Sequence, residues 1–490
     1  MKSDVIIVGG GIIGAIIARE LSRYKLRITL IEKTADIAFG GSTKANTGII
    51  HAGYDDQPGT LKAHLCVKGN RLWPDIAGEL SVPFKRTGSL VVAFNEEEVH
   101  TLLELKYRGE ANGVPYLELI EDHEKLRSME PNLNNTAVAA LHAPTAAIIS
   151  PYEMAVALAE NARQNGVRIT LNAEVKKIVL KGGGVRGVQT SKGLLEADYL
   201  INAAGLSSDA ISAMAGIDAF SITPVKGEYF VFDKRLSDVV HRVLFPVPTP
   251  LSKGIVVTHT TSGNLLIGPN ANSIDDKTDL STATPGLDEV FEGALKLVPS
   301  LSANRNLIIT HFAGLRAESS VGDFIIKSYE EPRGFINVAG IKSPGLTAAP
   351  AIAEMVITLL KQRGLELKPK ANFNPHHKPI PRAIDDLSNR NMKRLLTEDP
   401  RYGHMVCRCE HVSEGEIVEA IKRGAATLDG IKFRTRAGMG RCQGGFCTPH
   451  LLRIISRELG IKVEDVTKRG GGSTIVPYKA KSLLRGKGRT

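Results

Sequence analysis

The residues best suited to chemistry in this chain are four cysteines near its C-terminal end. They form a C-x-C pair, Cys407 and Cys409, and a C-x4-C pair, Cys442 and Cys447. Two close pairs of thiolates make a soft ligand set that suits an iron–sulfur cluster or zinc. Glycines around the second pair let the backbone wrap closely around such a site and turn amides toward sulfur. A cluster here predicts that the protein moves electrons, so a redox centre is expected elsewhere in the chain.

The N-terminal end carries a second pattern with chemical meaning. A short apolar strand runs into Gly9, Gly11 and Gly14 in the spacing G-x-G-x-x-G, a helix-like stretch follows, and a second apolar run ends in Glu32. Gly9 permits a tight turn, Gly11 lets the backbone approach a pyrophosphate, and Gly14 lets helix and strand pack. The helix then directs its positive dipole end at the phosphates, and the acid suits a ribose. Together they predict a dinucleotide site.

Composition narrows the class of protein. The chain has 490 residues, is 42% hydrophobic and carries a net charge of +10, which is enough for about three domains. No run approaches the roughly 18 apolar residues of a membrane span. The first strand follows Met1 almost directly, so no signal peptide is expected. Clustered cysteines favour a reducing cytoplasm. The basic residues lack interleaved aromatics, so nucleic-acid binding is not expected.

The strand and helix signals of the sequence indicate an α/β and α+β fold that would position these residues. Strand and helix signals alternate over the first 80 residues, which predicts a Rossmann-like domain. Short alternating runs predict an inserted antiparallel-sheet substrate domain. A small C-terminal helical module would then hold the cysteines. The predicted divisions are residues 1–365 with substrate portions at about 82–145 and 222–310, a linker over 366–403, the cysteine module over 404–460, and a basic tail over 461–490.

Residues 1–365 resemble the flavin oxidoreductases related to D-amino-acid oxidase and glycerol-3-phosphate dehydrogenase. The resemblance rests on the stretch from Gly9 to Glu32, on residues 40–51, on 202–205 and on 340–349. Within that group, His51-Ala-Gly-Tyr resembles the branch that contains L-2-hydroxyglutarate dehydrogenases and the large subunits of anaerobic glycerol-3-phosphate dehydrogenase. The cysteine module resembles the bacterioferritin-associated-ferredoxin type of [2Fe-2S] domain; zinc ribbons more often pair C-x-x-C with C-x-x-C.

This resemblance implies FAD as the bound dinucleotide. Glu32 would hold the adenosine ribose, Ser42 and Thr43 would help to bind the diphosphate, and the backbone of Val175 would reach the adenine. The start of the last long helix would lie by the pyrimidine end of the flavin, where its dipole stabilises the reduced ring. The expected cofactor-binding residues are Gly9, Gly11, Gly14, Glu32, Ser42, Thr43, Val175, Gly205, Gly345, Leu346 and Thr347.

The family position of His51 places it close to the flavin ring, where a histidine is a sensible acceptor for the proton of a hydroxyl group. His259 and His311 are weaker candidates, because each lies in a strand pattern without a motif. Arg316 resembles the arginine of the family's Gly-x-Arg segment, which clamps a carboxylate or phosphate. The family commonly has proline next, whereas this chain has Ala317. Further cations expected to bind the anionic hydroxy substrate are Lys226 and Lys342.

The leading hypothesis is an FAD enzyme that oxidises sn-glycerol 3-phosphate to dihydroxyacetone phosphate. Electrons would leave through a [2Fe-2S] cluster to a partner subunit or quinone-linked acceptor. The alternative substrate is L-2-hydroxyglutarate or another 2-hydroxy acid. A non-catalytic electron-transfer subunit is a hypothesis of a different class, and a zinc-dependent nucleic-acid binder is a third. The basic tail fits either a solvated terminus, an acidic partner subunit or an anionic membrane surface, so the expected location is cytoplasmic or peripheral to the inner face of the cell membrane.

Overall fold

The computed structural model describes residues 2–249, 253–382 and 389–483. The chain divides into two compact units. Unit 1 contains residues 1–33 and 40–377, and unit 2 contains residues 34–39 and 378–490. Within the described residues, no helix is long and apolar enough to cross a membrane.

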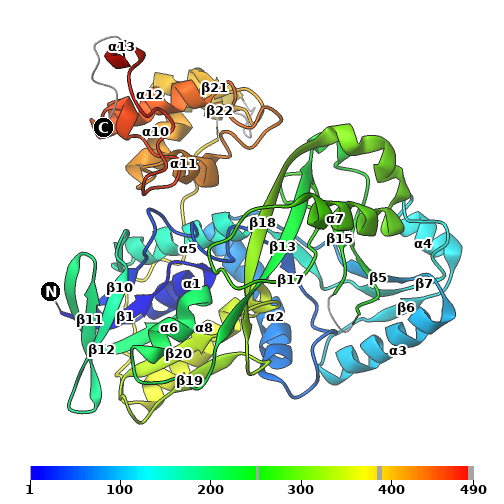
Figure 1. The fold of residues 1–490 in the computed structure, drawn as a ribbon, viewed down its shortest axis with the longest axis horizontal. Coiled ribbons are helices and arrows are strands. Elements are labelled where there is room, and N and C mark those ends of the chain that lie inside the picture. Colours follow the sequence, from blue (N-terminus) through cyan, green and yellow to red (C-terminus); the bar gives the residue numbers. More distant parts are fainter. Residues whose placement is uncertain (1, 250–252, 383–388, 484–490) are drawn as a thin grey trace. The chain divides into compact units, whose positions relative to one another are not determined.

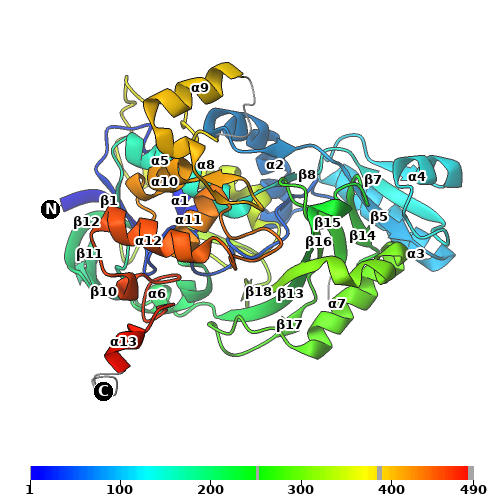
Figure 2. The ribbon, with the colours of Figure 1, turned by 90° about the horizontal axis from the view of Figure 1, so that it is seen from above.

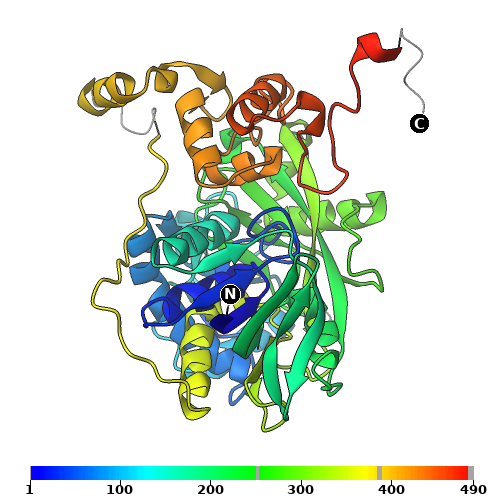
Figure 3. The ribbon, with the colours of Figure 1, turned by 90° about the vertical axis from the view of Figure 1, so that its left-hand side faces the viewer.

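The first sheet of unit 1 is built on parallel strands, as the alternating pattern predicts. β1 lies inside this eight-stranded sheet, between β12 and β2, and not at its edge (Figures 1 and 3). Parallel strands are covered on both faces, which explains why β2 is buried at every position. The strands are β1 (Lys2–Val8), β2 (Ile28–Ile31), β9 (Arg168–Thr170), β10 (Val175–Lys181), β11 (Gly184–Thr190), β12 (Gly193–Asn202), β19 (Ile325–Ser328) and β20 (Phe335–Ala339).

Helices cover this sheet and fix the strand ends. α1 is almost wholly buried, because it packs against both α5 and α8. α2 and α8 also pack closely, and Trp73 on α2 donates its indole N–H to the backbone at the start of α8. The helices are α1 (Ile12–Leu21), α2 (Leu61–Leu80), α5 (Pro151–Gln164), α6 (Ser208–Ala213) and α8 (Gly345–Gln362).

The second sheet of unit 1 is the mainly antiparallel sheet that the sequence predicts; its role as a substrate domain stays a prediction. Its nine strands come from two separate stretches of the chain, which meet where β14 pairs with β5. That pair is parallel, whereas every other neighbour in the sheet is antiparallel. The strands are β5 (Ser89–Ala93), β6 (Glu118–Ile120), β7 (Ala139–Ala143), β13 (Ile222–Phe232), β14 (Val243–Pro246), β15 (Val256–His259), β16 (Leu265–Gly268), β17 (Asn272–Ser273) and β18 (Ile308–Ser319).

An amphipathic helix completes the core of this sheet. α7 (Thr284–Leu297) packs on β13 and β16 (Figure 2) and buries Val290, Phe291 and Ala294 against strand residues such as Phe230. On other parts of the sheet lie α3 (Glu96–Ala111) and α4 (His123–Met129), and a small three-stranded sheet joins β3 (Ile49–Ile50), β8 (Ala147–Ile149) and β4 (Phe84–Lys85).

Unit 2 is helical, as predicted for the cysteine module. Its core is formed by α10 (Glu414–Lys422), α11 (Leu428–Thr435) and α12 (Thr448–Leu459), beside the short pair β21 (Met405–Cys407) and β22 (Val412–Ser413). A capping box starts α10, in which Ser413 and Glu416 bind each other's backbone N–H groups. α9 (Asn389–Glu398) precedes this core and α13 (Ala480–Leu483) follows it.

Two predicted boundaries differ from the structure. The module does not end at 460, because Val466 is fully buried in its core and α11 donates backbone N–H groups to Thr467 and Lys468. The predicted linker is also structured in part. Residues 366–377 belong to unit 1, where His377 pairs with Glu160. Residues 383–388 of the predicted linker and residues 484–490 of the basic tail lie outside the described residues.

Candidate active site and cysteine cluster

The turn between β1 and α1 can be built only with glycine at two of the predicted positions. Gly9 has φ +110°, and a Cβ there would lie 2.4 Å from the carbonyl oxygen of Ala203. A Cβ on Gly14 would lie 1.9 Å from the carbonyl oxygen of Gly9. The absence of side chains leaves the N-terminus of α1 open toward a ligand. Glu32 lies at the same place, and its Oε2 accepts a hydrogen bond of 2.7 Å from the backbone of Gly10.

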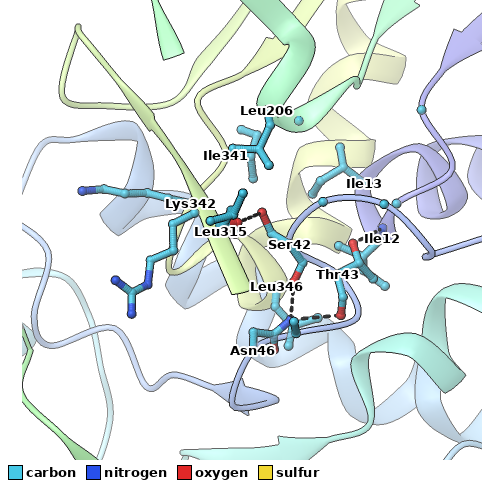
Figure 4. Close-up of a pocket in the computed structure, with 18 of the residues that line it drawn as sticks. Ile12, Ile13, Ser42, Thr43, Asn46, Leu206, Leu315, Ile341, Lys342 and Leu346 are labelled. Carbon is cyan, nitrogen blue, oxygen red and sulfur yellow. Dashed lines mark hydrogen bonds between the residues drawn. The ribbon is translucent and has the colours of Figure 1, made fainter. Parts of the chain in front are cut away.

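The loop that carries Ser42 and Thr43 joins this turn to the second sheet (Figure 4). Thr43 Oγ1 accepts the backbone N–H of Ile12 at 3.0 Å, so it caps a free amide in the first turn of α1. Ser42 Oγ donates to the carbonyl oxygen of Leu315 on β18. Asn46 holds the loop closed by donating to the carbonyl oxygens of Ser42 and Thr43. The loop is therefore ordered by its own residues.

A cavity of about 800 Å³ runs from this turn to the second sheet. Near the turn the lining includes Glu32 and Val175. The lining also includes one histidine, three cationic side chains and an aromatic ring: His51, Arg316, Lys342, Lys253 and Phe245. Most of the predicted cofactor-binding residues line it: Gly9, Gly11, Glu32, Ser42, Thr43, Val175, Gly205, Gly345 and Leu346. Gly14 and Thr347 do not, because each packs inside the protein.

Thr347 acts on His51 and not on the cavity. Its Oγ1 accepts the backbone N–H of His51 at 2.9 Å, and its side chain is fully buried. The carbonyl oxygen of His51 accepts a hydrogen bond from Asn70 at 2.8 Å. Both backbone groups of His51 are thus held, so the ring is carried by a fixed segment between β3 and α2.

The environment of His51 keeps its imidazole neutral. Burial and, to a smaller extent, the positive charge of Lys253 together lower the pKa of His51 from 6.5 to about 3, while Asp55 opposes both. The ring Nε2 lies 3.4 Å from Ser343 Oγ, and the ring centroid lies 6.0 Å from that of Phe245. A neutral imidazole has a free acceptor nitrogen, so His51 is able to take a proton. Its part in catalysis remains a prediction.

Lys253 and Asp55 form an ion pair beside His51 that sequence reasoning missed. Lys253 Nζ lies 2.5 Å from Asp55 Oδ2. Although burial opposes the charged ammonium, Asp55 and Asp56 raise the pKa of Lys253 above its ordinary value. Lys253 therefore brings a permanent positive charge to the cavity. The only signal was a lysine next to Gly254 at the end of a proline-rich stretch, which matches no motif.

Arg316 is held in a defined direction at the same cavity. Its Nη2 donates to the carbonyl oxygen of Asn270 at 2.9 Å, and the hydroxyl of Tyr229 is a second partner. Gly227 makes room for it, because a Cβ there would lie 2.7 Å from Arg316 Nη2. The guanidinium is fixed by backbone and phenol, which suits the binding of a planar or tetrahedral anion. Ala317, where the family commonly has proline, is buried.

The two predicted lysines have different surroundings. Lys342 lines the cavity and pairs with Glu318, which also lines it. Lys226 does not line the cavity, so the prediction that it binds substrate does not fit the structure. Its ammonium donates to Asp279 at 2.6 Å and to Ser281. The reason is strand alternation: Val225 lines the cavity, so the next side chain on β13 points to the other face. His259 and His311 are also absent from the lining residues.

The four cysteines come together in unit 2 as two pairs. Cys409 Sγ lies 3.6 Å from Cys442 Sγ, and Cys407 is hydrogen-bonded to Cys447. The Cys447 contact, helped by backbone N–H groups such as that of Gly438, lowers the pKa of Cys407 to about 6 against the opposing effect of burial. Cys407 and Cys447 are buried, whereas Cys409 is exposed. A Cβ on Gly440 would lie 2.2 Å from Cys409 Cβ, so the loop closes tightly around this pair.

This arrangement of thiols fits a two-iron cluster. Within the part of the chain that the structure describes, no three or more His, Cys, Asp or Glu side chains gather around the position of a single metal ion. A [2Fe-2S] cluster instead takes two thiolates on each iron, which matches two separate pairs. Cys409 and Cys442 would bind one iron, and Cys407 and Cys447 the other.

Comparison with known proteins identifies the larger part of the chain. Residues 4–359 match the family described as FAD dependent oxidoreductase. The chain belongs to this family. Residues 405–457 match the BFD-like [2Fe-2S] binding domain, which supports iron over the zinc alternative. The cofactors of this FAD dependent oxidoreductase are therefore FAD and a [2Fe-2S] cluster.

Three relatives place this FAD dependent oxidoreductase more narrowly. It is 47% identical over 484 residues to a glycerol 3-phosphate dehydrogenase of Caloramator mitchellensis, which covers 98% of this chain and 100% of the relative. It is 31% identical over 359 residues to a mitochondrial L-2-hydroxyglutarate dehydrogenase of Caenorhabditis elegans, covering 71% and 80% of the two chains. The solved structure of an L-alpha-glycerophosphate oxidase from Mycoplasma pneumoniae with FAD bound has a TM-score of 0.73 and 34% identity, covering 77% of this chain and 98% of that one.

The cavity of this FAD dependent oxidoreductase accepts FAD on the evidence of its own residues. Gly9 and Gly11 line the cavity without side chains, beside the N-terminus of α1 at Ile12, where backbone N–H groups suit a diphosphate. Glu32 lies beyond the turn, and the loop of Ser42 and Thr43 closes the side (Figure 4). The start of α8, with Gly345 and Leu346, lines the same cavity.

Proposed function

We propose that this protein oxidises sn-glycerol 3-phosphate to dihydroxyacetone phosphate and passes the electrons through its [2Fe-2S] cluster to a partner. The observation that carries the proposal is the meeting of a neutral His51 with three cations, Arg316, Lys342 and Lys253, in one cavity. A hydroxyl group needs a proton acceptor, and a phosphate needs several cations. The full-length similarity to a glycerol 3-phosphate dehydrogenase supports the same substrate.

Oxidation of the secondary alcohol breaks one O–H bond and one C–H bond. FAD, when bound, supplies the acceptor for the hydride that leaves carbon. The hydroxyl proton goes to Nε2 of His51, which is unprotonated because burial and Lys253 lower its pKa to about 3. Thr347 and Asn70 hold the backbone of His51, so the ring cannot drift from the substrate. The proton then leaves to solvent.

The phosphate group is expected to bind at Arg316 and Lys342. The guanidinium of Arg316 can offer two parallel N–H donors to phosphate oxygens, while its remaining donors stay on Asn270 and Tyr229. Lys342 adds a point charge that is now balanced by Glu318. A phosphate places about 1.5 to 2 negative charges on one group at neutral pH, whereas each carboxylate carries one, so cations that meet at a single group favour the phosphate.

The exposure of residues around the cysteines supports our proposal that electrons pass from the cluster to a partner subunit. Cys409 is exposed, and Phe446, next to Cys447, is 81% exposed. Arg408 and Arg441 flank the Cys409–Cys442 pair in the chain and are both exposed. A partner that accepts electrons here would carry acidic residues, and association with the inner face of the membrane would come through that partner.

The second candidate substrate is L-2-hydroxyglutarate or a related 2-hydroxy acid. The observation in its favour is the fork of Arg316, which suits a carboxylate as well as a phosphate, together with the similarity to an L-2-hydroxyglutarate dehydrogenase. The same base, His51, would serve both reactions.

The deciding experiment is an anaerobic titration of purified holoprotein. Glycerol 3-phosphate is added first, then L-2-hydroxyglutarate, with glycerol as the control that lacks the phosphate, and the flavin and cluster absorbances are followed. We expect bleaching by glycerol 3-phosphate alone and formation of dihydroxyacetone phosphate. Bleaching by L-2-hydroxyglutarate alone would transfer the protein to the second candidate. Intact flavin with every compound would contradict both and favour a non-catalytic electron-transfer subunit.

A further inference from the structure

Six residues from the N-terminal part of the chain belong to unit 2. Residues 34–39, here called the anchor segment, group with residues 378–490. In the sequence the anchor segment begins two positions after Glu32 and ends three positions before Ser42. Both flanking residues line the cofactor cavity of unit 1. One continuous stretch of chain therefore carries cofactor-binding residues at its two ends and is bound to the cysteine module at its centre.

The anchor segment is held by a buried ion pair. Arg434 on α11 donates to both carboxylate oxygens of Asp36, with Nη2 at 2.9 Å from Oδ1. The two side chains are 6% and 2% exposed. Arg434 also donates to the carbonyl oxygen of Gly430, which fixes the direction of the guanidinium. A buried pair in this two-pronged geometry is strongly directional, because removal of one partner leaves an uncompensated charge.

Packing on either side of the ion pair is equally specific. The rings of Phe39 and Phe433 meet edge to face at 5.4 Å between centroids. A Cβ on Gly430 would lie 2.8 Å from Asp36 Oδ2, and one on Gly470 would lie 2.5 Å from Ala35 Cβ. The module therefore has a receptor for residues 34–39 built from α11 and from the segment after α12. Such complementarity is not expected of a loop that merely passes the module.

We propose that Asp36 and Arg434 are positioning residues for electron transfer from the flavin to the [2Fe-2S] cluster. The inference rests on the proposed function. One residue separates the anchor segment from Glu32 and two separate it from Ser42. Attachment of the anchor segment to α11 therefore limits, by chain length alone, the distance between the module and the stretch that binds the dinucleotide. Transfer of electrons slows steeply as the gap between the centres grows, so loss of the anchor slows this step. Neither residue touches the substrate.

Oxidation of one alcohol would pass a hydride, which carries two electrons, to FAD and one proton to His51. The hydrogen of that hydride leaves as a proton to solvent when the flavin gives up the two electrons. The cluster takes one electron, by which one of its Fe³⁺ ions becomes Fe²⁺. It takes the second after a one-electron acceptor such as ferricyanide has reoxidised it. Only the passage of electrons from flavin to cluster depends on the anchor segment.

The test uses the holoprotein and the variant Asp36→Asn, with Asp399→Asn as the matched control. Asp399 pairs with Arg401 in the same unit, but both side chains are partly exposed. Flavin bleaching and cluster bleaching are followed separately after anaerobic mixing with glycerol 3-phosphate, and again after photoreduction of the flavin. Hydrogen exchange of residues 34–39 is measured in parallel. Breaking a buried pair weakens the anchored state by a factor of about 100 or more.

For Asp36→Asn we expect flavin bleaching at the wild-type rate, cluster bleaching slowed roughly tenfold or more, and faster exchange of residues 34–39; Asp399→Asn should match wild type throughout. Cluster bleaching at the wild-type rate would overturn the proposal. So would equal slowing of both cofactors, which would point to a damaged flavin site. If Asp36→Asn lacks its cluster, Phe433→Leu removes the edge-to-face contact, keeps the ion pair and decides by the same criteria.

Photoreduction separates this proposal from the proposed substrate. If glycerol 3-phosphate leaves the wild-type flavin oxidised, that result contradicts only the proposed substrate. Photoreduction of the flavin still allows electron transfer to the cluster to be measured. If photoreduced flavin reduces the cluster at the same rate in wild type and Asp36→Asn, that result contradicts only the proposed role of the anchor segment.

Discussion

Replacement of Lys253 by methionine tests the electrostatic basis of the site. In the wild type the pKa of His51 falls from 6.5 to about 3. At about 1.4 kcal/mol per pKa unit, this fall is a preference of about 5 kcal/mol for the neutral ring. Burial is the largest cause, Lys253 the next, and Asp55 opposes them. Lys253→Met removes the second cause and leaves the opposing carboxylate without its partner at 2.5 Å.

The sign of the effect is fixed by these charges. An unpaired carboxylate close to an imidazole stabilises its protonated form and raises its pKa by about one to three units. In Lys253→Met the pKa of His51 should therefore lie at about 4 to 6. Proton acceptance requires the neutral ring, so the variant loses activity as pH falls through that range. In the wild type, with a His51 pKa of about 3, the ring is half protonated only near pH 3.

The assay is the limiting rate of anaerobic flavin reduction at saturating glycerol 3-phosphate, measured between pH 4.5 and 8. The substrate phosphate also titrates near pH 6, so only the difference between the two profiles counts. Lys253→Arg keeps the charge and should follow the wild type. Lys253→Met with Asp55→Asn removes both charges and should return the acid limb toward the wild-type position. Coincident profiles for wild type and Lys253→Met would refute the reasoning.

Three further substitutions test single contacts. His51→Gln should slow flavin reduction by about 10² to 10⁴ with unchanged FAD content, as loss of a general base does; stopped-flow absorbance measures it, and a wild-type rate would remove His51 from the mechanism. Arg316→Met should raise KM for glycerol 3-phosphate by roughly 10- to 150-fold, because it removes charge-assisted hydrogen bonds worth about 1.5–3 kcal/mol. Steady-state kinetics should show kcat little changed, and an unaltered KM would mean that the phosphate binds elsewhere. Gly9→Ala should yield protein without FAD, because its Cβ would meet Ala203, whereas Gly78→Ala, with nothing within 4 Å, should keep full flavin absorbance.

The sequence predicts those parts of the site that depend on neighbours along the chain. The turn of Gly9, Gly11 and Gly14 is specified by local sterics, and Glu32 follows at the end of the adjacent parallel strand. The fold class is confirmed for the same reason, because alternating strand and helix periods reflect which faces are buried. The gathering of the four thiols was also predictable from their narrow ligand chemistry. The structure, however, pairs each cysteine of one motif with a cysteine of the other, Cys409 with Cys442 and Cys407 with Cys447.

The incorrect and missing residues depend on register and on distant loops. Val225 lies directly opposite Arg316 in the antiparallel pair of β13 and β18, so these two share a face and Lys226 lies on the other. One residue of register decides the outcome, and sequence alone does not supply it. Lys253 reaches Asp55 across 198 positions of chain from a loop without a motif. The extension of the module past residue 460 depends on Val466, in a stretch without helical periodicity.

The anchor segment also has a consequence for how the protein is made. Asp36 is synthesised before Arg434, with a separation of 398 positions in the chain. Unit 1, whose residues precede and follow the anchor segment in the sequence, is synthesised first, and domains generally fold as units during synthesis. The anchor segment, between Glu32 and Ser42, therefore cannot bind the module until α11 has been synthesised. Attachment of the anchor segment is therefore one of the last events of maturation, completed only by a chain that has already built its cysteine module.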